Sequence, residues 1–182
     1  MLKKLISTLL ISSAVVLTGA AHAQSPATPT LNAPSAAAPI VPSAPDLAAT
    51  SYLLIDANSG AVLVENNADN PLPPASLTKM MTSYIVSQEI KRGQIGENDQ
   101  VLVSEKAWRM GGSKMFIRVG NQVPVIDLLR GVIIQSGNDA SIALAEHVAG
   151  SEDAFADLMN AQAQRLGMTN SHFVNATGWP AE

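Results

Sequence analysis

Cysteine is absent from the 182-residue sequence, and this absence excludes several kinds of site. The protein has no thiol nucleophile, no disulfide framework and no thiolate metal site. Histidine is almost as scarce, because outside the first 23 residues there are only His147 and His172. Neither has a second histidine at metal-binding spacing, so the sequence predicts no metal site, and it contains no cofactor motif.

Charged residues make up only 14% of the chain, and those near the N-terminus are informative. Two lysines precede an apolar run, and Ala21-His22-Ala23 forms a small-x-small cleavage motif. This pattern predicts a secretory signal peptide over residues 1–23. A retained transmembrane anchor is less favoured, because the run is short and interrupted by serine and threonine. Cleavage would leave nine basic against 15 acidic residues, a net charge of -6, which disfavours a nucleic-acid partner.

Residues 24–50 carry six prolines among Ala, Ser and Thr, with a single charged side chain, Asp46. Such a composition has little to bury and predicts a Pro/Ala-rich linker. The folded part would then occupy residues 51–182, about 130 residues, which is enough for one hydrophobic core.

Two short β-rich runs, at 52–55 and 61–64, flank Asn58-Ser59-Gly60 and predict a β-hairpin. From Leu77 onward, apolar residues recur at helical spacing and predict a helix whose N-cap or first turn contains Ser76. Because Lys79 is the only charged residue between 77 and 88, this helix should be largely buried. Its apolar face is expected to comprise Leu77, Met80, Met81, Tyr84 and Ile85.

The remaining chain is predicted to be mostly helical. Two extended pieces are expected within 99–105 and 113–120, followed by helices at 124–135 and 138–148. Ser151 is a suitable N-cap for a last helix that ends before Gly167. Strands come first and helices follow, so the predicted fold class is α+β.

Ser76 and Lys79 are three residues apart on the first predicted helix, which places their side chains on one face. An unprotonated lysine can accept the proton of a serine hydroxyl, so the pair is a candidate nucleophile and base. Work near neutral pH requires the lysine pKa to fall by roughly 3 units, at a cost of about 4 kcal/mol, and burial can supply that shift. The simpler interpretation is a lysine that reaches solvent from a helix end, because Ser-x-x-Lys also occurs by chance.

A second polar cluster, Ser136-Gly137-Asn138, lies between two predicted helices, where glycine permits a tight turn. Such a turn can direct a hydroxyl and a carboxamide into a cleft. Alternatively, Ser136 only ends one helix and Asn138 only caps the next.

Together, Ser-x-x-Lys within PASLTKMMTSY and Ser-x-Asn within IIQSGNDASIALA resemble the first two motifs of the penicillin-recognising serine enzymes. These motifs, with GSKMFIRVG and LGMTNSHFVNATG, are similar to the low-molecular-mass penicillin-binding proteins that act as D-alanyl-D-alanine carboxypeptidases. The resemblance covers about residues 51–178. It implies the serine β-lactamase/penicillin-binding-protein-like transpeptidase fold, with an antiparallel sheet and a helical cluster.

The resemblance also implies roles for four residues. Ser76 would be the nucleophile that attacks the penultimate D-alanine of a peptidoglycan stem peptide ending in D-Ala-D-Ala, and Lys79 would be the general base. Ser136 would relay a proton to the leaving D-alanine, and Asn138 would hold the substrate backbone. A β-lactam antibiotic would acylate the same serine, and the expected location is the periplasm.

The family's third motif, Lys-Thr-Gly, does not occur at any lysine of this sequence. The resemblance therefore implies an N-terminal part of the catalytic domain at 51–182, an incomplete fold without the C-terminal strands of the sheet. We expect the 182-residue chain by itself to have little or no carboxypeptidase activity and to aggregate readily. The family's C-terminal β-rich domain and amphipathic membrane helix would also lie outside it, so peripheral membrane association could come only from that missing region.

The residues leave rival functions open. A D,D-endopeptidase of peptidoglycan cross-links would use the same nucleophile and base, and a non-catalytic cell-wall scaffold would retain the motifs as packing. A class A β-lactamase is disfavoured because no Glu-x-x-Leu-Asn motif follows Asn138. A Ser-His-Asp hydrolase is disfavoured because there is no Gly-x-Ser-x-Gly elbow, so His147 and His172 are interpreted as structural.

Overall fold

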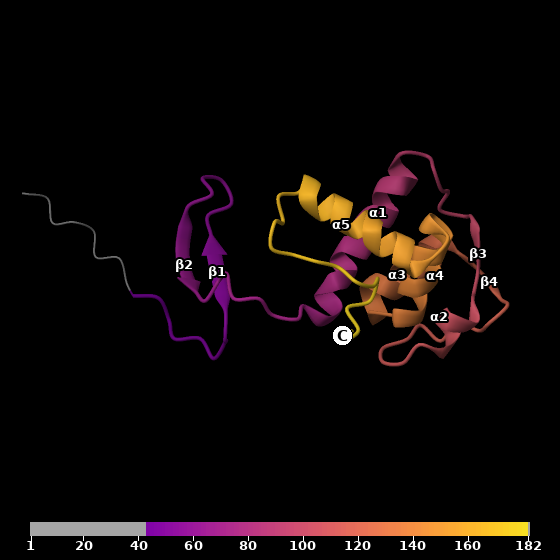
Figure 1. The fold of residues 1–182 in the computed structure, drawn as a ribbon, viewed down its shortest axis with the longest axis horizontal. Helices are drawn as coiled ribbons and strands as arrows, with labels where there is room; N and C mark the ends of the chain where they lie inside the picture. Colours follow the sequence, from indigo (N-terminus) through magenta and orange to yellow (C-terminus); the bar gives the residue numbers. More distant parts are fainter. Residues whose placement is uncertain (1–42, 182) are drawn as a thin grey trace, which may run out of the picture. The chain divides into compact units, whose positions relative to one another are not determined.

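The computed structural model describes residues 43–181, and all regular elements lie within the unit that begins at Leu47 (Figure 1). The signal peptide predicted at 1–23 and most of the predicted linker lie outside the described residues. The mixture of helices and small antiparallel sheets confirms the α+β class. The elements are β1 (Tyr52–Ile55), β2 (Val62–Asn66), η1 (Ala75–Leu77), α1 (Thr78–Lys91), β3 (Gln100–Leu102), α2 (Glu105–Arg109), β4 (Gln122–Pro124), α3 (Val125–Gln135), α4 (Asn138–Ala149) and α5 (Glu152–Arg165).

Strands β1 and β2 form the predicted hairpin. They pair antiparallel, with Tyr52 opposite Asn66. In the turn, the Asp56 carboxylate accepts hydrogen bonds from the backbone N–H (2.7 Å) and the hydroxyl (2.7 Å) of Ser59. Gly60 follows with φ of +72°, a conformation that glycine adopts without strain. The hairpin is therefore confirmed, although its second strand lies slightly later than the expected 61–64.

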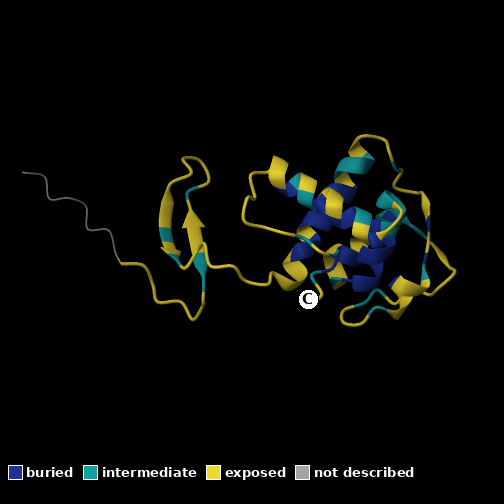
Figure 2. Cartoon of the chain, viewed as in Figure 1, coloured by how far each residue is buried: buried dark blue, intermediate teal, exposed yellow. Residues whose placement is uncertain are grey.

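The hairpin exposes most of its apolar side chains, and Figure 2 shows it largely in the colour of exposed residues. A two-stranded sheet buries little surface by itself and is marginally stable in water. The apolar residues that are at least half exposed are Leu53, Leu54, Ile55, Val62 and Leu63.

Helix α4 is the centre of the helical part. It packs against α1, α2, α3, α5 and β3, and every residue from Asn138 to Ala145 is buried. Buried residues gather where these helices face one another (Figure 2). The largest fully buried apolar side chains in this core are Phe155, Leu128, Ile142, Leu144 and Met159. Helix α4 itself confirms the predicted helix at 138–148.

Helix α1 exists as predicted, but it buries a different face. Leu77, Met80 and Tyr84 are 68%, 71% and 38% exposed, so the expected apolar face is wrong at these positions. The buried face is mixed, because Thr82 donates to the backbone oxygen of Ala176 and polar groups of the helix meet that chain segment. The buried face of the helix thus combines apolar side chains with polar groups that donate to the backbone oxygens of Ala176 and Thr177. The buried residues of α1 are Thr78, Lys79, Met81, Thr82, Ile85 and Val86.

The two expected extended pieces have different outcomes. Strand β3 lies within 99–105, and it pairs antiparallel with β4. The segment 113–120 contains no strand, and the partner strand β4 comes just after it. Backbone N–H groups of Met115 and Ile117 donate to the side chain of Asp139 instead of to a neighbouring strand. The sequence around 113–120 does not predict this side-chain acceptor, which explains why the predicted strand is wrong.

The ends of the last helices agree with the sequence. Pro124 is the N-cap residue of α3, directly before the helix that was expected to begin with it. The hydroxyl of Ser151 accepts from the backbone N–H of Ala154 at 3.1 Å and caps α5, as predicted. Because this cap fixes the first turn of α5, it also fixes the position of Glu152.

Candidate active site

Ser76 and Lys79 are in direct contact. Ser76 lies in η1, which runs into α1 without a side-chain cap, so Ser76 is not the N-cap residue. The amine Nζ of Lys79 donates to Oγ of Ser76 at 3.1 Å. The Lys79 residue is only 4% exposed, and burial lowers the pKa of its amine from the ordinary lysine value. A lysine with a lowered pKa, within hydrogen-bond distance of a serine hydroxyl, can act as a base toward it.

The backbone just before Ser76 is in an unusual conformation. Ala75 has φ of +49°, in the left-handed region that residues with a side chain rarely adopt. Gly178, also left-handed with φ of +75°, lies directly against it. A Cβ atom at Gly178 would overlap with the carbonyl group of Ala75 and approach Oγ1 of Thr78. The glycine therefore permits a close approach that fixes the entry to the helix carrying both Ser76 and Lys79.

Ser136 shares a pocket with this pair. It is the C-cap residue of α3 and has φ of +53°, so the helix ends sharply there. The pocket has a volume of about 390 Å³ and is lined by Ser76, Lys79, Met80, Ser83, Val132, Ile133 and Ser136. The structure thus brings together three of the four predicted site residues. It leaves room beside them for a small group of a substrate.

Asn138, the fourth predicted site residue, is held beside this site by a loop. Its Nδ2 donates to the backbone oxygen of Gly111 at 2.7 Å, and its backbone N–H donates to the backbone oxygen of Ser113 at 2.8 Å. It is 5% exposed and is not among the residues that line the pocket. Its carboxamide therefore already holds the 111–113 loop in place.

Thr177 is a site residue that sequence reasoning missed. Its backbone oxygen accepts from Nζ of Lys79 at 2.8 Å, a buried hydrogen bond that is shorter than the one to Ser76. The oxygen belongs to a turn in which Oδ1 of Asn175 accepts from the backbone N–H groups of Thr177 (3.1 Å) and Gly178 (2.7 Å). An Asn two and three residues before these donors is a recognisable turn signal. The sequence around Asn175 does not indicate that this turn contacts Lys79.

Asp139 fixes the segment that directly follows the 111–113 loop. Its fully buried carboxylate accepts from the N–H groups of Met115 (2.9 Å), Ile117 (3.2 Å) and Ala140 (2.9 Å). A buried charge is tolerated when several donors satisfy it. Asp139 therefore ties the 113–117 segment to the start of α4, one residue after Asn138.

Within residues 43–181, no group of three or more His, Asp and Glu side chains is placed to hold a metal ion. In the same range, no helix is both long enough and apolar enough to cross a bilayer.

This geometry suits one class of chemistry. A serine hydroxyl beside a buried lysine amine, with a second serine on the same pocket, is the arrangement that serine acyl transfer with a lysine base requires. Residues 38–182 match the D-alanyl-D-alanine carboxypeptidase family, peptidase S11. The chain belongs to this family.

Named relatives agree with the family assignment. D-alanyl-D-alanine carboxypeptidase DacA of Escherichia coli (strain K12) is 48% identical over 149 residues, which cover 79% of this chain and 37% of the relative. DacC of the same organism is 51% identical over 144 residues, which cover 76% of this chain and 36% of the relative. The chain thus spans little more than a third of the length of the curated relatives it matches.

Solved structures confirm the predicted transpeptidase fold. The D-alanyl-D-alanine carboxypeptidase DacD from Francisella tularensis is similar with a TM-score of 0.75 and 45% identity, over 79% of this chain and 35% of that one. Penicillin binding protein 5 from Haemophilus influenzae is similar with a TM-score of 0.74 and 44% identity, over 78% of this chain and 42% of that one.

Proposed function

We propose that the protein is a serine-type D-alanyl-D-alanine carboxypeptidase that removes the terminal D-alanine from peptidoglycan stem pentapeptides. The observation that carries the proposal is the 3.1 Å contact between Nζ of Lys79 and Oγ of Ser76 in a pocket that Ser136 also lines. The relatives named D-alanyl-D-alanine carboxypeptidase support it, because about half of the residues are identical over more than three quarters of this chain.

In the proposed mechanism, Lys79 enters the reaction as a neutral amine. It accepts the proton of the Ser76 hydroxyl as Oγ attacks the carbonyl carbon of the penultimate D-alanine. The backbone N–H of Ser76 donates to the developing oxyanion, which lowers the barrier because that charge exists only in the transition state. Collapse of the tetrahedral intermediate breaks the peptide bond and leaves an ester on Ser76.

The leaving D-alanine needs a proton at its amine. Lys79 is now protonated, and Ser136 relays a proton from it to the leaving nitrogen across the shared pocket. Water then hydrolyses the ester by the reverse sequence of proton transfers, which restores Ser76 and the neutral amine. Asn138 is proposed to bind the substrate backbone from the edge of the site, with its position set by Gly111.

A β-lactam would acylate Ser76 by the same attack, because its strained amide resembles the scissile peptide. A solved relative supports this part of the proposal: penicillin-binding protein D2 from Listeria monocytogenes, described in the ampicillin bound form, is 28% identical over 76% of this chain with a TM-score of 0.67. We further propose that residues 1–23 direct export and that the protein acts in the periplasm on the cell wall, with no cofactor.

The test is covalent labelling with a fluorescent penicillin, followed by mass spectrometry of the labelled peptide. The complete product of the gene should be labelled on Ser76, and Ser76→Ala should abolish the signal. Ser87→Ala is the matched control, because Ser87 is an exposed serine on the same helix. Labelling that persists at full stoichiometry in Ser76→Ala would contradict the proposal. A cell-wall scaffold predicts that Ser76→Ala keeps the cellular phenotype, whereas an enzyme predicts its loss.

A second candidate function is D,D-endopeptidase activity on peptidoglycan cross-links. It is favoured by one relative, the D-alanyl-D-alanine endopeptidase of Pseudomonas aeruginosa (PAO1), which is 37% identical over 73% of this chain and 42% of the relative. Muropeptide analysis after digestion separates the two candidates. Loss of pentapeptides indicates the carboxypeptidase, and loss of dimers indicates the endopeptidase.

A further inference from the structure

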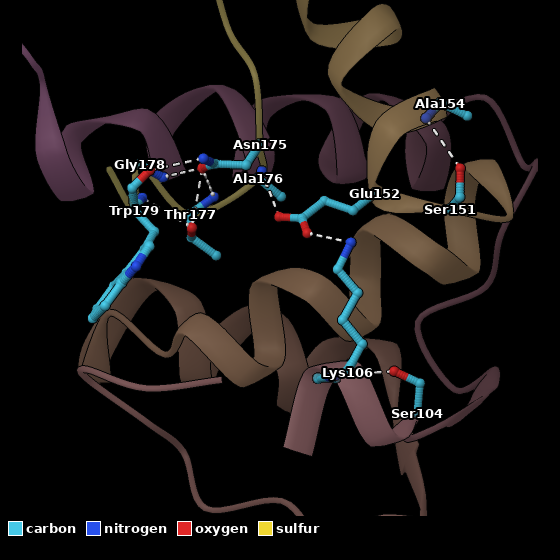
Figure 3. Close-up of polar contacts among 11 residues, drawn as sticks. Ser104, Lys106, Ser151, Glu152, Ala154, Asn175, Ala176, Thr177, Gly178 and Trp179 are labelled. Atoms are coloured by element: carbon cyan, nitrogen blue, oxygen red, sulfur yellow. Dashed lines mark hydrogen bonds and ion pairs between the residues drawn. The ribbon is translucent and has the colours of Figure 1, made fainter. Parts of the chain in front are cut away.

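The turn at 175–179, which supplies the Thr177 oxygen to Lys79, is built from its own side chains (Figure 3). Besides the two backbone bonds to Asn175 Oδ1, the Asn175 Nδ2 donates to the backbone oxygen of Trp179 at 2.8 Å. The N–H of Trp179 in turn donates to Oγ1 of Thr177 at 3.0 Å. These bonds make the turn a rigid unit, but they do not attach it to the helices.

Besides the bond from Lys79 to the Thr177 oxygen, the turn is attached to the helices through the N–H and the backbone oxygen of Ala176. Its N–H donates to Oε1 of Glu152 at 3.0 Å, and its backbone oxygen accepts from Oγ1 of Thr82 at 2.7 Å. Glu152 comes from α5 and Thr82 from α1, the helix that also carries Lys79. The next backbone oxygen after Ala176 is that of Thr177, which accepts from Lys79.

Glu152 is itself held by a charge from another helix. Its second oxygen, Oε2, lies 2.9 Å from Nζ of Lys106 on α2, and the Glu152 side chain is only 8% exposed (Figure 3). The contact with Glu152 raises the pKa of Lys106 above its ordinary value, so the lysine stays charged. Lys106 and Glu152 each lie in the first turn of a helix that a serine side chain caps: Ser104 caps α2, and Ser151 caps α5.

We propose that the Lys106–Glu152 ion pair is the positioning device of Lys79: it fixes Ala176, and through Ala176 the Thr177 oxygen, against the amine that contacts Ser76. The expected effect of the pair on acylation rests on the proposed function, whereas its expected effect on the position and pKa of Lys79 does not. Neither Lys106 nor Glu152 reaches the reacting atoms, so both act through the turn. The pair connects α2, α5 and the 175–179 turn at one point.

The Lys79 pKa can report whether the amine stays buried in its position, because few other charges act on it. Its amine faces Ser76 Oγ and the Thr177 oxygen, and Lys79 is the only charged residue that lines the described pocket. Several charged groups on the helices packed against α1 have hydrogen-bond or ion-pair partners of their own. These are Asp127 paired with Arg130 on α3, Asp139 bound to three amides on α4, and Glu152 paired with Lys106 on α5.

The test variant is Lys106→Met combined with Glu152→Met. It removes one positive and one negative charge, so the net charge near the site is unchanged, and Met replaces both side chains with apolar chains of similar length. The Lys106 side chain is 53% exposed, and Met fills the space of the buried Glu152 side chain without leaving an unpaired buried charge, so the variant should fold. The Ala176 N–H nevertheless loses its acceptor. Lys106→Arg keeps the pair, and Glu105→Gln removes the exposed Glu105–Arg109 pair of the same short helix as a control.

The first measurement does not require activity. In protein labelled with 13C at the lysine ε carbons, the Lys79 signal, assigned by its loss in Lys79→Met, is titrated by NMR. We expect the double Met variant to raise the Lys79 pKa toward the ordinary value, because water reaches the amine when the Thr177 oxygen withdraws. Lys106→Arg and Glu105→Gln should titrate like the wild type. An unchanged Lys79 pKa in a folded double variant would overturn the proposal.

The second measurement is the rate of acylation by penicillin as a function of pH. Displacement of the amine should slow acylation by up to about 100-fold in the double variant and move the acidic limb of the profile to higher pH. A purely structural role would lower the melting temperature and leave this limb in place. If the wild type is not acylated at all, the proposed function fails, and the NMR titration still decides whether the pair positions Lys79.

Discussion

The amine of Lys79 lies 2.8 Å from the backbone oxygen of Thr177, a residue 98 positions later in the chain. The amine therefore has two partners, the hydroxyl that it is proposed to deprotonate and a carbonyl that cannot lose or gain a proton. A carbonyl accepts from an amine in either charge state, so it orients the nitrogen in both. Burial then lowers the pKa, and together these features make a lysine usable as a base.

The lowered pKa of Lys79 predicts how stability depends on pH. The charged amine is disfavoured in the fold, so between the folded pKa and the unfolded value the unfolded state binds more protons. Stability is reduced at all pH values below the folded pKa, and it recovers as pH rises toward the unfolded value. The free energy of unfolding of the wild type relative to Lys79→Met should thus increase with pH in the alkaline range, by at most about 1.4 kcal/mol per pH unit.

Urea unfolding at several pH values measures this difference, with exposed Lys91→Met as the control. A difference that falls with pH would mean that the amine is stabilised in its charged form. The same Lys79→Met variant should lose about 100-fold or more in acylation rate, the usual contribution of a general base.

Substitution of Gly178 tests the contact with Ala75. Gly178→Ala places a methyl group on the Ala75 carbonyl, so it should lower the free energy of unfolding and also displace Ser76. Gly167 is a matched control, because it has the same φ of +75° and open space around its Cβ position. Gly167→Ala should cost about 1–2 kcal/mol from the backbone alone, and Gly178→Ala about 1–3 kcal/mol more from overlap. Equal costs and equal acylation rates would show that the close approach has no consequence.

Removal of the Asp139 carboxylate should loosen the 113–117 segment. Asp139→Ala leaves the N–H groups of Met115 and Ile117 without their acceptor, and we expect a loss of about 2–4 kcal/mol. Hydrogen exchange at these two amides should become faster while exchange in α5 stays slow. Asp157→Ala, at an exposed position of α5, should change stability by less than about 0.5 kcal/mol. Unchanged exchange at Met115 and Ile117 would be inconsistent with this role of Asp139.

The exposed hairpin predicts association. Leu54 and Leu63 are 55% and 59% exposed on a sheet that, within residues 43–181, has only two strands, a surface that favours edge-to-edge pairing. Leu54→Lys combined with Leu63→Lys should reduce light scattering of the 182-residue chain, because charged residues oppose strand pairing. Leu158→Lys, on an exposed position of α5 at 42%, should have little effect. Scattering that responds equally to both variants would point to general surface hydrophobicity.

Local patterns predicted most of the elements because their determinants lie within a few residues of one another. The hairpin follows from β-rich runs around Asp56 to Gly60, and α5 follows from its Ser151 cap. The predictions failed where a distant group decides the local structure. The 113–120 segment is no strand because Asp139, more than 20 residues later, accepts its N–H groups. The buried face of α1 is set by Ala176 and Thr177, which no window around α1 contains.

In the candidate site, too, some features follow from the local sequence and others depend on distant chain segments. By itself, the sequence determined that Ser76 and Lys79 are in contact, because residues three apart on a helix lie on one face. It also predicted that Ser136 and Asn138 lie in a turn between two helices. Only the tertiary structure decided that Ser136 shares their pocket, that Thr177 holds Lys79, and that Lys106 and Glu152 hold the turn. The physical reason is range: helical spacing is a local property, whereas burial and the partners of a buried amine depend on chain segments that meet only when the protein folds.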